Sequence, residues 1–211
     1  MVRLLVLGAT GGLGKALTRQ AAESFEVTAF VRDVNKAAEL ATIPNVTVVS
    51  GDASSEDDVF NAIQGQDVVI SAVGGFDKLL ALNTNIIAQA EKAGVKRLYL
   101  TGGAGCLNLP DGSLLADSPN FPVLFRKASK EIHLISLERL QNTSLDWTFT
   151  APARMLPGER TKQFRVSIDV AIPEALAGVT SYEDVADAII STIDKPEYFK
   201  HKIGVAGPAK Q

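Results

Sequence analysis

Glycines follow the first apolar run of the chain at a spacing that suits the binding of a pyrophosphate. The segment GATGGLG at 8–14 lies between that run and a stretch with helical periodicity. Gly8 allows a tight turn, Gly11 lets the backbone approach a phosphate, and Gly14 permits close packing of helix on strand. The amino end of the following helix adds unpaired N–H groups and a positive dipole. The segment therefore predicts a dinucleotide site.

Two alternatives exist for this segment. A nucleoside triphosphate loop, GxxxxGK followed by Ser or Thr, needs a glycine where Ala9 stands and a magnesium-binding hydroxyl where Ala16 stands. The sequence does not meet either requirement. The second alternative is a glycine-rich turn that binds no ligand, and the strand before and the helix after it make this the less favoured interpretation.

The residues after the second apolar run distinguish NADP from NAD. A 2′-phosphate is bound by cations and a free 2′-hydroxyl by a carboxylate. Arg32 ends the run, Lys36 follows about one helical turn later, and Thr10 adds a hydroxyl from the glycine loop. Guanidinium suits bidentate binding of phosphate, so NADP is expected. Asp33 leaves NAD as the less favoured alternative, and solvated turn charges are the interpretation without a ligand.

Asp52 and Ala53 follow the third apolar run and are expected to flank the adenine. The Asp52 carboxylate would meet the exocyclic amine of that base. A turn residue or helix cap ahead of Ser54 is a nearly equal alternative for Asp52.

The elements that must position these residues alternate regularly between strand and helix. Many of the apolar runs are rich in Val, Ile and Leu on both faces, which is typical of parallel strands buried in a sheet. The predicted strands are 2–7, 26–31, 46–50, 67–71, 96–101, 146–151 and 202–206. The predicted helices are 13–24, 35–41, 55–64, 78–93, 123–142 and 182–194. This order predicts an α/β fold, a Rossmann-type doubly wound parallel sheet with helices on both faces.

Two long segments, 102–122 and 152–180, interrupt this alternation and are predicted to be loops. They follow late strands, so they should form a small lid on the substrate side of the sheet. Helix caps are expected at Ser54 or Ser55, at Ser181, and at Gly94 as a C-terminal glycine.

Composition limits the class of protein. The 211 residues are 46% hydrophobic and 21% charged, which fits one soluble globular domain over 1–211. A net charge of −3 argues against a general binder of nucleic acid or anionic membranes.

One cysteine excludes an internal disulfide, and two histidines leave too few ligands for a zinc site, so no metal is expected. Apolar runs fall far short of the roughly 20 residues that span a bilayer, and 2–7 is interpreted as a strand and not as a signal peptide. We expect a cytoplasmic protein, monomeric or weakly homodimeric.

Several of these segments together resemble the atypical short-chain dehydrogenase/reductase superfamily: GATGGLG, FVRD at 30–33, GDA at 51–53 and TGGAG at 101–105. Within it, the chain is similar to the NADH-flavin reductase group, close to NmrA-like proteins and biliverdin reductase B. The segments 117–122 and 145–165 carry the more specific part of the resemblance.

The resemblance implies a set of residues that bind NADP. For the adenosine half these are Gly8, Thr10, Gly11, Gly12, Leu13, Arg32, Lys36, Asp52 and Ala53. Ala72, Val73 and Gly74 would line the ribose and pyrophosphate, and Thr101 with Pro152 would frame the nicotinamide.

The chain departs from the wider superfamily in its catalytic residues. Typical members carry Tyr-x-x-x-Lys on the helix after the fifth strand, where the tyrosine protonates a carbonyl oxygen. The helix predicted at 123–142 has no tyrosine, and Tyr198-x-x-x-Lys202 lies before the last strand, so we interpret that match as chance. No catalytic residue is assigned.

The sequence therefore predicts an NADPH-dependent oxidoreductase that passes a hydride to a planar acceptor, a flavin such as FMN or a quinone, whose delocalised charge needs no protein acid. A non-catalytic NADP-binding redox sensor that acts on a protein partner is the alternative. A third hypothesis is a reductase or isomerase of another metabolite, with Thr101 or Lys130 as acid. Apolar residues that could line the acceptor site, or simply pack in the core or lid, are Phe76, Leu107, Phe121, Met155 and Leu156.

Other polar residues are predicted to be structural. Cys106 has no cation beside it in sequence and is expected to be a small packing residue. His133 is expected at the helix surface or in a helix hydrogen bond, and His201 in a solvated basic cluster. Arg154 and Arg160 could contact an anionic substrate, although pairing with Glu159 or Glu174 is favoured.

Overall fold

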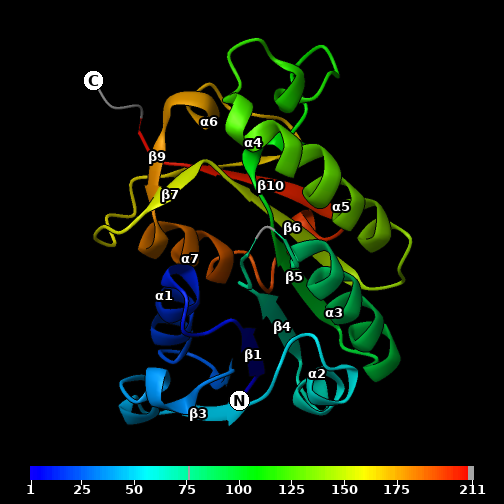
Figure 1. Cartoon of the computed structure of the whole chain (residues 1–211). Coiled ribbons are helices and arrows are strands. Elements are labelled where there is room, and N and C mark those ends of the chain that lie inside the picture. The colour runs from blue at the N-terminus through cyan, green and yellow to red at the C-terminus, as the bar shows by residue number, and fades with distance from the viewer. Residues whose placement is uncertain (76, 209–211) are drawn as a thin grey trace.

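A computed structural model describes residues 1–75 and 77–208 of the chain. In that part of the chain, eight strands form a central sheet in the order β3-β2-β1-β4-β5-β6-β10-β8 (Figure 1). Neighbouring strands are parallel except β10 and β8, which are antiparallel. The strands are β1 (Arg3–Leu7), β2 (Glu26–Val31), β3 (Val46–Ser50), β4 (Val68–Ser71), β5 (Arg97–Thr101), β6 (Asp146–Pro152), β8 (Arg165–Ile168) and β10 (His201–Ala206). All predicted strands are confirmed, and β8 is added at one edge.

The strand order reverses direction at β1. The chain moves from β1 outward through β2 to β3, and then returns to place β4 on the other side of β1. This is the predicted Rossmann-type, doubly wound sheet. The loops that leave β1 and β4 diverge at the carboxyl edge, and ligands of open α/β sheets bind in the crevice between such loops.

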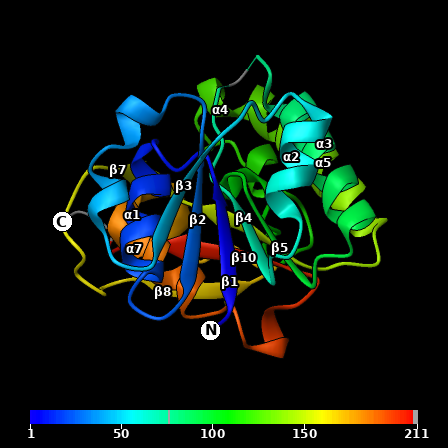
Figure 2. The same cartoon turned by 90° about the horizontal axis from the view of Figure 1, so that it is seen from below.

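Helices cover both faces of the sheet (Figure 2). The helices on one face are α1 (Gly12–Ala21) and α7 (Tyr182–Ile190). Those on the other face are α2 (Glu56–Ile63), α3 (Leu79–Ala93), α4 (Val123–Ala128) and α5 (Leu134–Gln141). The buried apolar side chains form two clusters, one under each helical layer.

Strand β1 shows how the sequence produces this layering. Leu4 and Val6 belong to the cluster under α1 and α7, whereas Leu5 and Leu7 belong to the cluster on the opposite face. All four side chains are fully buried. Because side chains alternate along a strand, a run that is apolar at every position is stable only between two layers. Each such side chain contributes roughly 1.5–3 kcal/mol by its burial.

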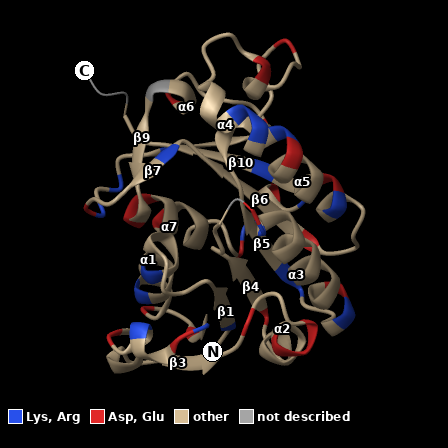
Figure 3. Ribbon diagram, viewed as in Figure 1, with Lys and Arg blue, Asp and Glu red and all other residues tan. Residues whose placement is uncertain are grey.

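The expected caps lie at helix ends. Ser55, and not Ser54, accepts from the Asp58 N–H at the start of α2. Ser181 accepts from the Asp184 N–H at the start of α7. Acidic residues lie in the first turns of both helices (Figure 3), where they complement the helix dipole. Gly94 ends α3 with φ 65°, a left-handed conformation that favours glycine.

The prediction of an uninterrupted loop at 152–180 is wrong. This segment contains β8, the short helix α6 (Glu174–Ala177) and a second sheet in which β7 (Arg154–Leu156) pairs in parallel with β9 (Val179–Ser181). Strands of three residues are too short to produce a recognisable period in the sequence. The segment 102–122 contains only short 3-10 turns as regular elements.

Two predicted helices differ in detail. The 35–41 segment forms 3-10 turns at Val34–Ala37 and Leu40–Thr42, not an α-helix. The 123–142 helix is interrupted by a π-helical turn at Ser129–His133, between α4 and α5. Among the described residues, no helix is long and apolar enough to cross a membrane.

Candidate functional site

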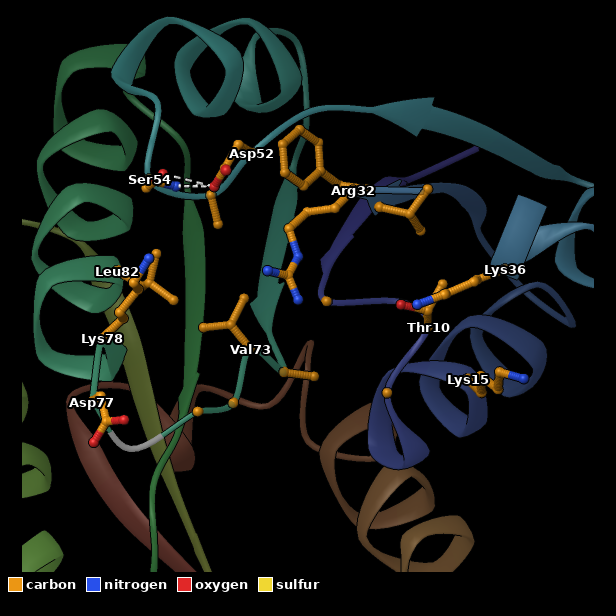
Figure 4. A pocket seen from close by; sticks show the side chains of 18 residues that line it. Thr10, Lys15, Arg32, Lys36, Asp52, Ser54, Val73, Asp77, Lys78 and Leu82 are labelled. Carbon is orange, nitrogen blue, oxygen red and sulfur yellow. Dashed lines mark hydrogen bonds between the residues drawn. The ribbon is translucent and has the colours of Figure 1, made fainter. Parts of the chain in front are cut away.

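A pocket of about 870 Å³ lies where the strand order reverses, at the carboxyl ends of β1, β2 and β4 (Figure 4). Most of the predicted cofactor-binding residues line it: Gly8, Thr10, Gly11, Arg32, Lys36, Asp52, Ala53, Ala72, Val73 and Gly74. Four others do not line it: Gly12, Leu13, Thr101 and Pro152. The first set comes from four separate loops, which the sheet brings together.

The glycine loop has the geometry that its spacing predicts. Gly8 has φ 81°, and a Cβ there would lie 2.9 Å from the Ala72 carbonyl oxygen. A Cβ on Gly14 would lie 2.1 Å from the Gly8 carbonyl oxygen, so only glycine lets α1 pack this close to the loop. At Gly11, the N-cap of α1, the nearest atom to a Cβ is 3.4 Å away, so the protein leaves this position open. On the side of Gly11, the amino end of α1 therefore faces the pocket without a side chain of its own over it.

Neither the position that a Gly12 side chain would take nor the Leu13 side chain faces the pocket. A Cβ on Gly12 would lie 2.6 Å from the ring of Tyr182, the first residue of α7. Leu13 is buried in the cluster under α1 and α7. Any contact of these two residues with a ligand must come from their backbone N–H groups. The sequence carries no local signal for the Tyr182 contact, because the two residues are distant along the chain.

The residues expected to bind a 2′-phosphate come together. Figure 4 shows the Arg32 guanidinium projecting into the pocket, and Lys36 and Thr10 line the same pocket. Both cationic side chains are exposed. Asp33, the residue that could have bound an NAD ribose, does not line the pocket. Its carboxylate caps the following 3-10 turn by accepting from the Asn35 N–H at 3.0 Å.

Two further cations line the pocket and were not predicted. Lys15, on α1, pairs with Glu39 at 2.7 Å. Lys78 precedes α3 and lies on the opposite side of the pocket from Lys36 (Figure 4). Lys15 directly follows Gly14 of the glycine loop, so its place in the sequence could have predicted that it lines the pocket. Lys78 has no comparable signal.

Asp52 lies at the pocket but is already engaged. Its Oδ1 accepts from the Ser54 N–H and the Ser54 hydroxyl, both at 2.8 Å. These hydrogen bonds, with smaller contributions from Arg32 and Lys78, hold the pKa of the Asp52 carboxyl below its usual value. The turn role that the sequence left open for Asp52 is therefore present. Contact with an adenine would use the remaining oxygen.

Thr101 and Pro152 end β5 and β6, beyond the residues that line the pocket. The Thr101 hydroxyl is buried and has no hydrogen-bond partner among the described residues. Buried hydroxyl groups in proteins are nearly always paired, so an unpaired one is unusual. The next strand inward, β4, ends at the lining residues Ala72 to Gly74.

The apolar residues considered for an acceptor site separate into two groups. Leu107 and Phe121 belong to the buried core, which was the structural alternative. Met155 and Leu156 lie on β7 and are half-buried. Phe76 lies outside the described residues.

Cys106 is fully buried, and burial raises the pKa of its thiol to about 12. This supports a packing role.

Lys202 donates to the Cys106 carbonyl oxygen at 3.0 Å, near the start of β10. The Tyr198–Lys202 pair therefore lies at the start of β10, two strands from β5 and not on the helix that follows β5. Among the described residues no group of side chains forms a metal site.

The structure differs in detail from three expectations about charged and polar residues. Arg160 pairs with Asp187 and with Glu23, at 3.0 Å from the latter, and not with Glu159 or Glu174. His201 is not simply solvated, because its Nδ1 lies 2.5 Å from an Asp169 carboxylate oxygen. His133 is half-buried, with its Nδ1 shielded from solvent and without a hydrogen-bond partner among the described residues. The partners of the first two residues are distant in sequence, so no local pattern marks them.

The comparison with known proteins agrees with this geometry. A family described as NAD(P)H-binding matches residues 8–196, which include the glycine loop and the strands β2 and β4 that border the pocket. This chain belongs to that NAD(P)H-binding family. The resemblance to atypical short-chain dehydrogenases/reductases and NmrA-like proteins is thereby confirmed.

Solved structures similar over the whole length carry different descriptions. A protein of Bacteroides thetaiotaomicron assigned as an epimerase is 32% identical, with a TM-score of 0.86 over 100% of this chain and 99% of that one. An anaerobilin reductase of Escherichia coli is 26% identical, with a TM-score of 0.83 over 100% and 99%. A protein of Streptococcus pneumoniae assigned as an NADH-flavin reductase is 28% identical, with a TM-score of 0.80 over 99% and 100%.

Proposed function

We propose that this protein is an NADPH-dependent oxidoreductase that passes a hydride to a planar acceptor such as a flavin or a quinone. The observation that carries the choice of NADPH is that Arg32 and Lys36, which follow β2, line the same pocket as Thr10 and the rest of the glycine loop. Cations at this position suit a 2′-phosphate. Asp33, the competing carboxylate, is occupied by its own turn.

The residues that line the pocket support the following placement of a dinucleotide. The first-turn N–H groups of α1 and the open face of Gly11 would hold the pyrophosphate. Ala72 to Gly74 would lie along the ribose. When bound, the reduced nicotinamide supplies a hydride.

The choice of a planar acceptor follows from the residues that the chain lacks. No tyrosine occurs in 123–141, where the superfamily places its acid. Lys130, an alternative acid, is paired with Asp117 at 2.5 Å. A ring that delocalises negative charge can take its proton from water, so the protein need only hold donor and acceptor face to face. The E. coli and S. pneumoniae neighbours support this class, since one is an anaerobilin reductase and the other is assigned as an NADH-flavin reductase.

The experiment is oxidation of NADPH by purified protein, followed by absorbance, with FMN, riboflavin or a small quinone as acceptor. NADH is run in parallel, and reactions without protein measure the spontaneous rate. Saturable, protein-dependent turnover with NADPH preferred over NADH is the expected result. Tight NADPH binding with no turnover on any acceptor would overturn the proposal and support an NADP-binding redox sensor.

A further inference from the structure

One cation of the pocket is already paired with a carboxylate. Lys15 lies near the start of α1 and lines the pocket (Figure 4). Its amine is 2.7 Å from a carboxylate oxygen of Glu39, a residue that does not line the pocket. Among the described residues, no ion pair is formed by the other cations that line the pocket, which are Arg32, Lys36 and Lys78. Lys15 therefore differs from them in having a counter-ion within the chain.

The Glu39 carboxylate belongs to the segment that also carries Lys36. Lys36 lies in the 3-10 turn Val34–Ala37, and the next two residues keep helical dihedral angles, with φ −54° and ψ −40° at Ala38 and φ −64° and ψ −33° at Glu39. Side chains three residues apart on such a segment leave it on the same side. The Lys15 amine thus extends from α1 to the segment whose other charged side chain, Lys36, lines the pocket.

A carboxylate at this place does not suit an anionic ligand. The hydrogen bond and the charge of Lys15, with a smaller contribution from Arg19, hold the pKa of the Glu39 carboxyl below its usual value, so this group is ionised at neutral pH. It would repel a 2′-phosphate and withhold one cation from it. A phosphate monoester carries about −1.5 to −2 charges at pH 7 and a carboxylate only one. The phosphate therefore competes with Glu39 for the amine, which is carried on a flexible stem.

On the basis of the proposed function, we propose that Lys15 is a third cation for the 2′-phosphate of NADPH, and that Glu39 is the counter-ion that Lys15 leaves when this cofactor binds. Before binding, the ion pair holds the amine at Glu39. On binding, the amine exchanges the carboxylate for the phosphate, and no covalent bond changes. The Glu39 side chain is 58% exposed, so solvent can take the place of its partner. Glu39 is thus a positioning residue that lowers the affinity for NADPH but not for NADH, which has no 2′-phosphate.

The experiment measures the Kd for NADPH and for NADH in the wild type, in Glu39→Gln, in Lys15→Met and in the double variant. Glu39→Gln removes the charge and keeps the shape, and Lys15→Met keeps an unbranched stem without the charge. Glu23→Gln is the matched control, because Glu23 also pairs with a cation, Arg160, has a 61% exposed side chain and does not line the pocket. Adenosine 2′,5′-bisphosphate and adenosine 5′-monophosphate serve as the smallest probes with and without the 2′-phosphate. The Tm of each variant checks its fold.

Glu39→Gln should bind NADPH and the bisphosphate about fivefold more tightly, because Lys15 is released and a repulsion between like charges is lost. Binding of NADH and of the monophosphate should change by less than about twofold. Lys15→Met should bind NADPH roughly tenfold more weakly, which is the size expected for one contact between a cation and a phosphate. In the Lys15→Met background, Glu39→Gln should tighten NADPH binding only about twofold, because no amine remains to be released. Glu23→Gln should change neither affinity, and the Tm should stay near the wild-type value throughout, because exposed ion pairs add little stability.

Four results would overturn this inference. Glu39→Gln could leave the NADPH Kd at the wild-type value, or it could tighten NADH binding as much as NADPH binding. Lys15→Met could retain the wild-type affinity for NADPH. An equal gain from Glu39→Gln with and without Lys15 would show repulsion at a distance and no exchange of the amine. Failure of the proposed function looks different: the wild-type protein itself would bind NADPH no more tightly than NADH, or would oxidise no NADPH with any acceptor.

Discussion

The loops after β1 to β4 and those after β5 and β6 lie at the same edge of the sheet but hold their polar groups differently. In the first region Arg32 and Lys36 are exposed side chains that remain solvated until an anion arrives. In the second region the Thr101 hydroxyl and His133 Nδ1 are buried and unpaired among the described residues. The polar groups of the first region therefore cost the ligand-free protein little stability, whereas the buried, unpaired groups of the second region lower its stability.

The largest expected effects separate binding from folding within the glycine loop. Gly11→Val should weaken dinucleotide binding roughly a hundredfold or more, since about 3 kcal/mol of phosphate contacts would be lost, while the fold survives because its Cβ has space. Gly14→Val should instead destabilise the protein by about 3 kcal/mol or more, because its Cβ would collide with the Gly8 carbonyl. Calorimetric titration and thermal unfolding measure the two effects, and retained NADPH affinity in Gly11→Val would contradict the assignment of the loop.

The second effect tests the buried imidazole through pH. Because burial lowers the pKa of His133 to about 4, protonation favours the unfolded chain, whose histidine has the ordinary value of about 6.5. The contribution of this group to stability is complete above pH 6.5 and is lost as the pH falls toward 4, by about 3 kcal/mol in total. Urea unfolding at several pH values measures it.

His133→Leu is the reference for this measurement, since carboxylates also lose stability at acid pH in both proteins. The difference between the two unfolding free energies should depend on pH between 6.5 and 4. A difference that does not change over this range would show that the ring is solvated in the folded protein.

The third effect concerns the exposed cations. Arg32→Ala should weaken NADPH binding by about 2 kcal/mol, roughly thirtyfold, and NADH binding by much less, because only the former has a 2′-phosphate. Lys127→Ala, which removes an exposed cation on α4, should change neither affinity. Fluorescence titration of both cofactors checks this, and equal losses for NADPH and NADH would refute the phosphate assignment.

The smallest effects compare one helix cap from each region. Ser55→Ala removes the N-cap of α2 and should lower the free energy of unfolding by about 1 kcal/mol. Ser181→Ala should cost more, because the Ser181 hydroxyl also donates to the Glu159 carbonyl oxygen at 2.8 Å and so fixes the segment after β7. Chemical denaturation compares the two variants, and equal losses would mean that the Glu159 contact adds nothing.

The sequence predicts the first region well because its signals are local. Strands buried on both faces appear as apolar runs, and Gly8, Gly11, Gly14, Arg32 and Lys36 directly follow two of them. The geometry of parallel strands then places all five at one edge. The pocket confirms Gly8, Gly11, Arg32 and Lys36 as lining residues.

The second region is less predictable because its contacts are not local. The ring of Tyr182 covers Gly12, and β7 pairs with β9 across more than twenty residues, so neither leaves a periodic pattern. The sequence does not predict the burial of His133 Nδ1, for another reason. A π-helical turn adds a residue and shifts the helical phase by roughly 100°, so a 3.6-residue period extended over 123–142 assigns the wrong face.

The packing of α7 on α1 has a consequence for synthesis of the chain on the ribosome. Arg19 and Gln20 of α1 bond Glu183, and the ring of Tyr182 covers Gly12, so the glycine loop is supported from behind by residues near the carboxyl end. The loop and its strand leave the ribosome before α7 and β10, and their hydrophobic cluster is incomplete until those two elements follow. The part of the protein that is easiest to recognise in the sequence is therefore among the last to become stable in the nascent chain.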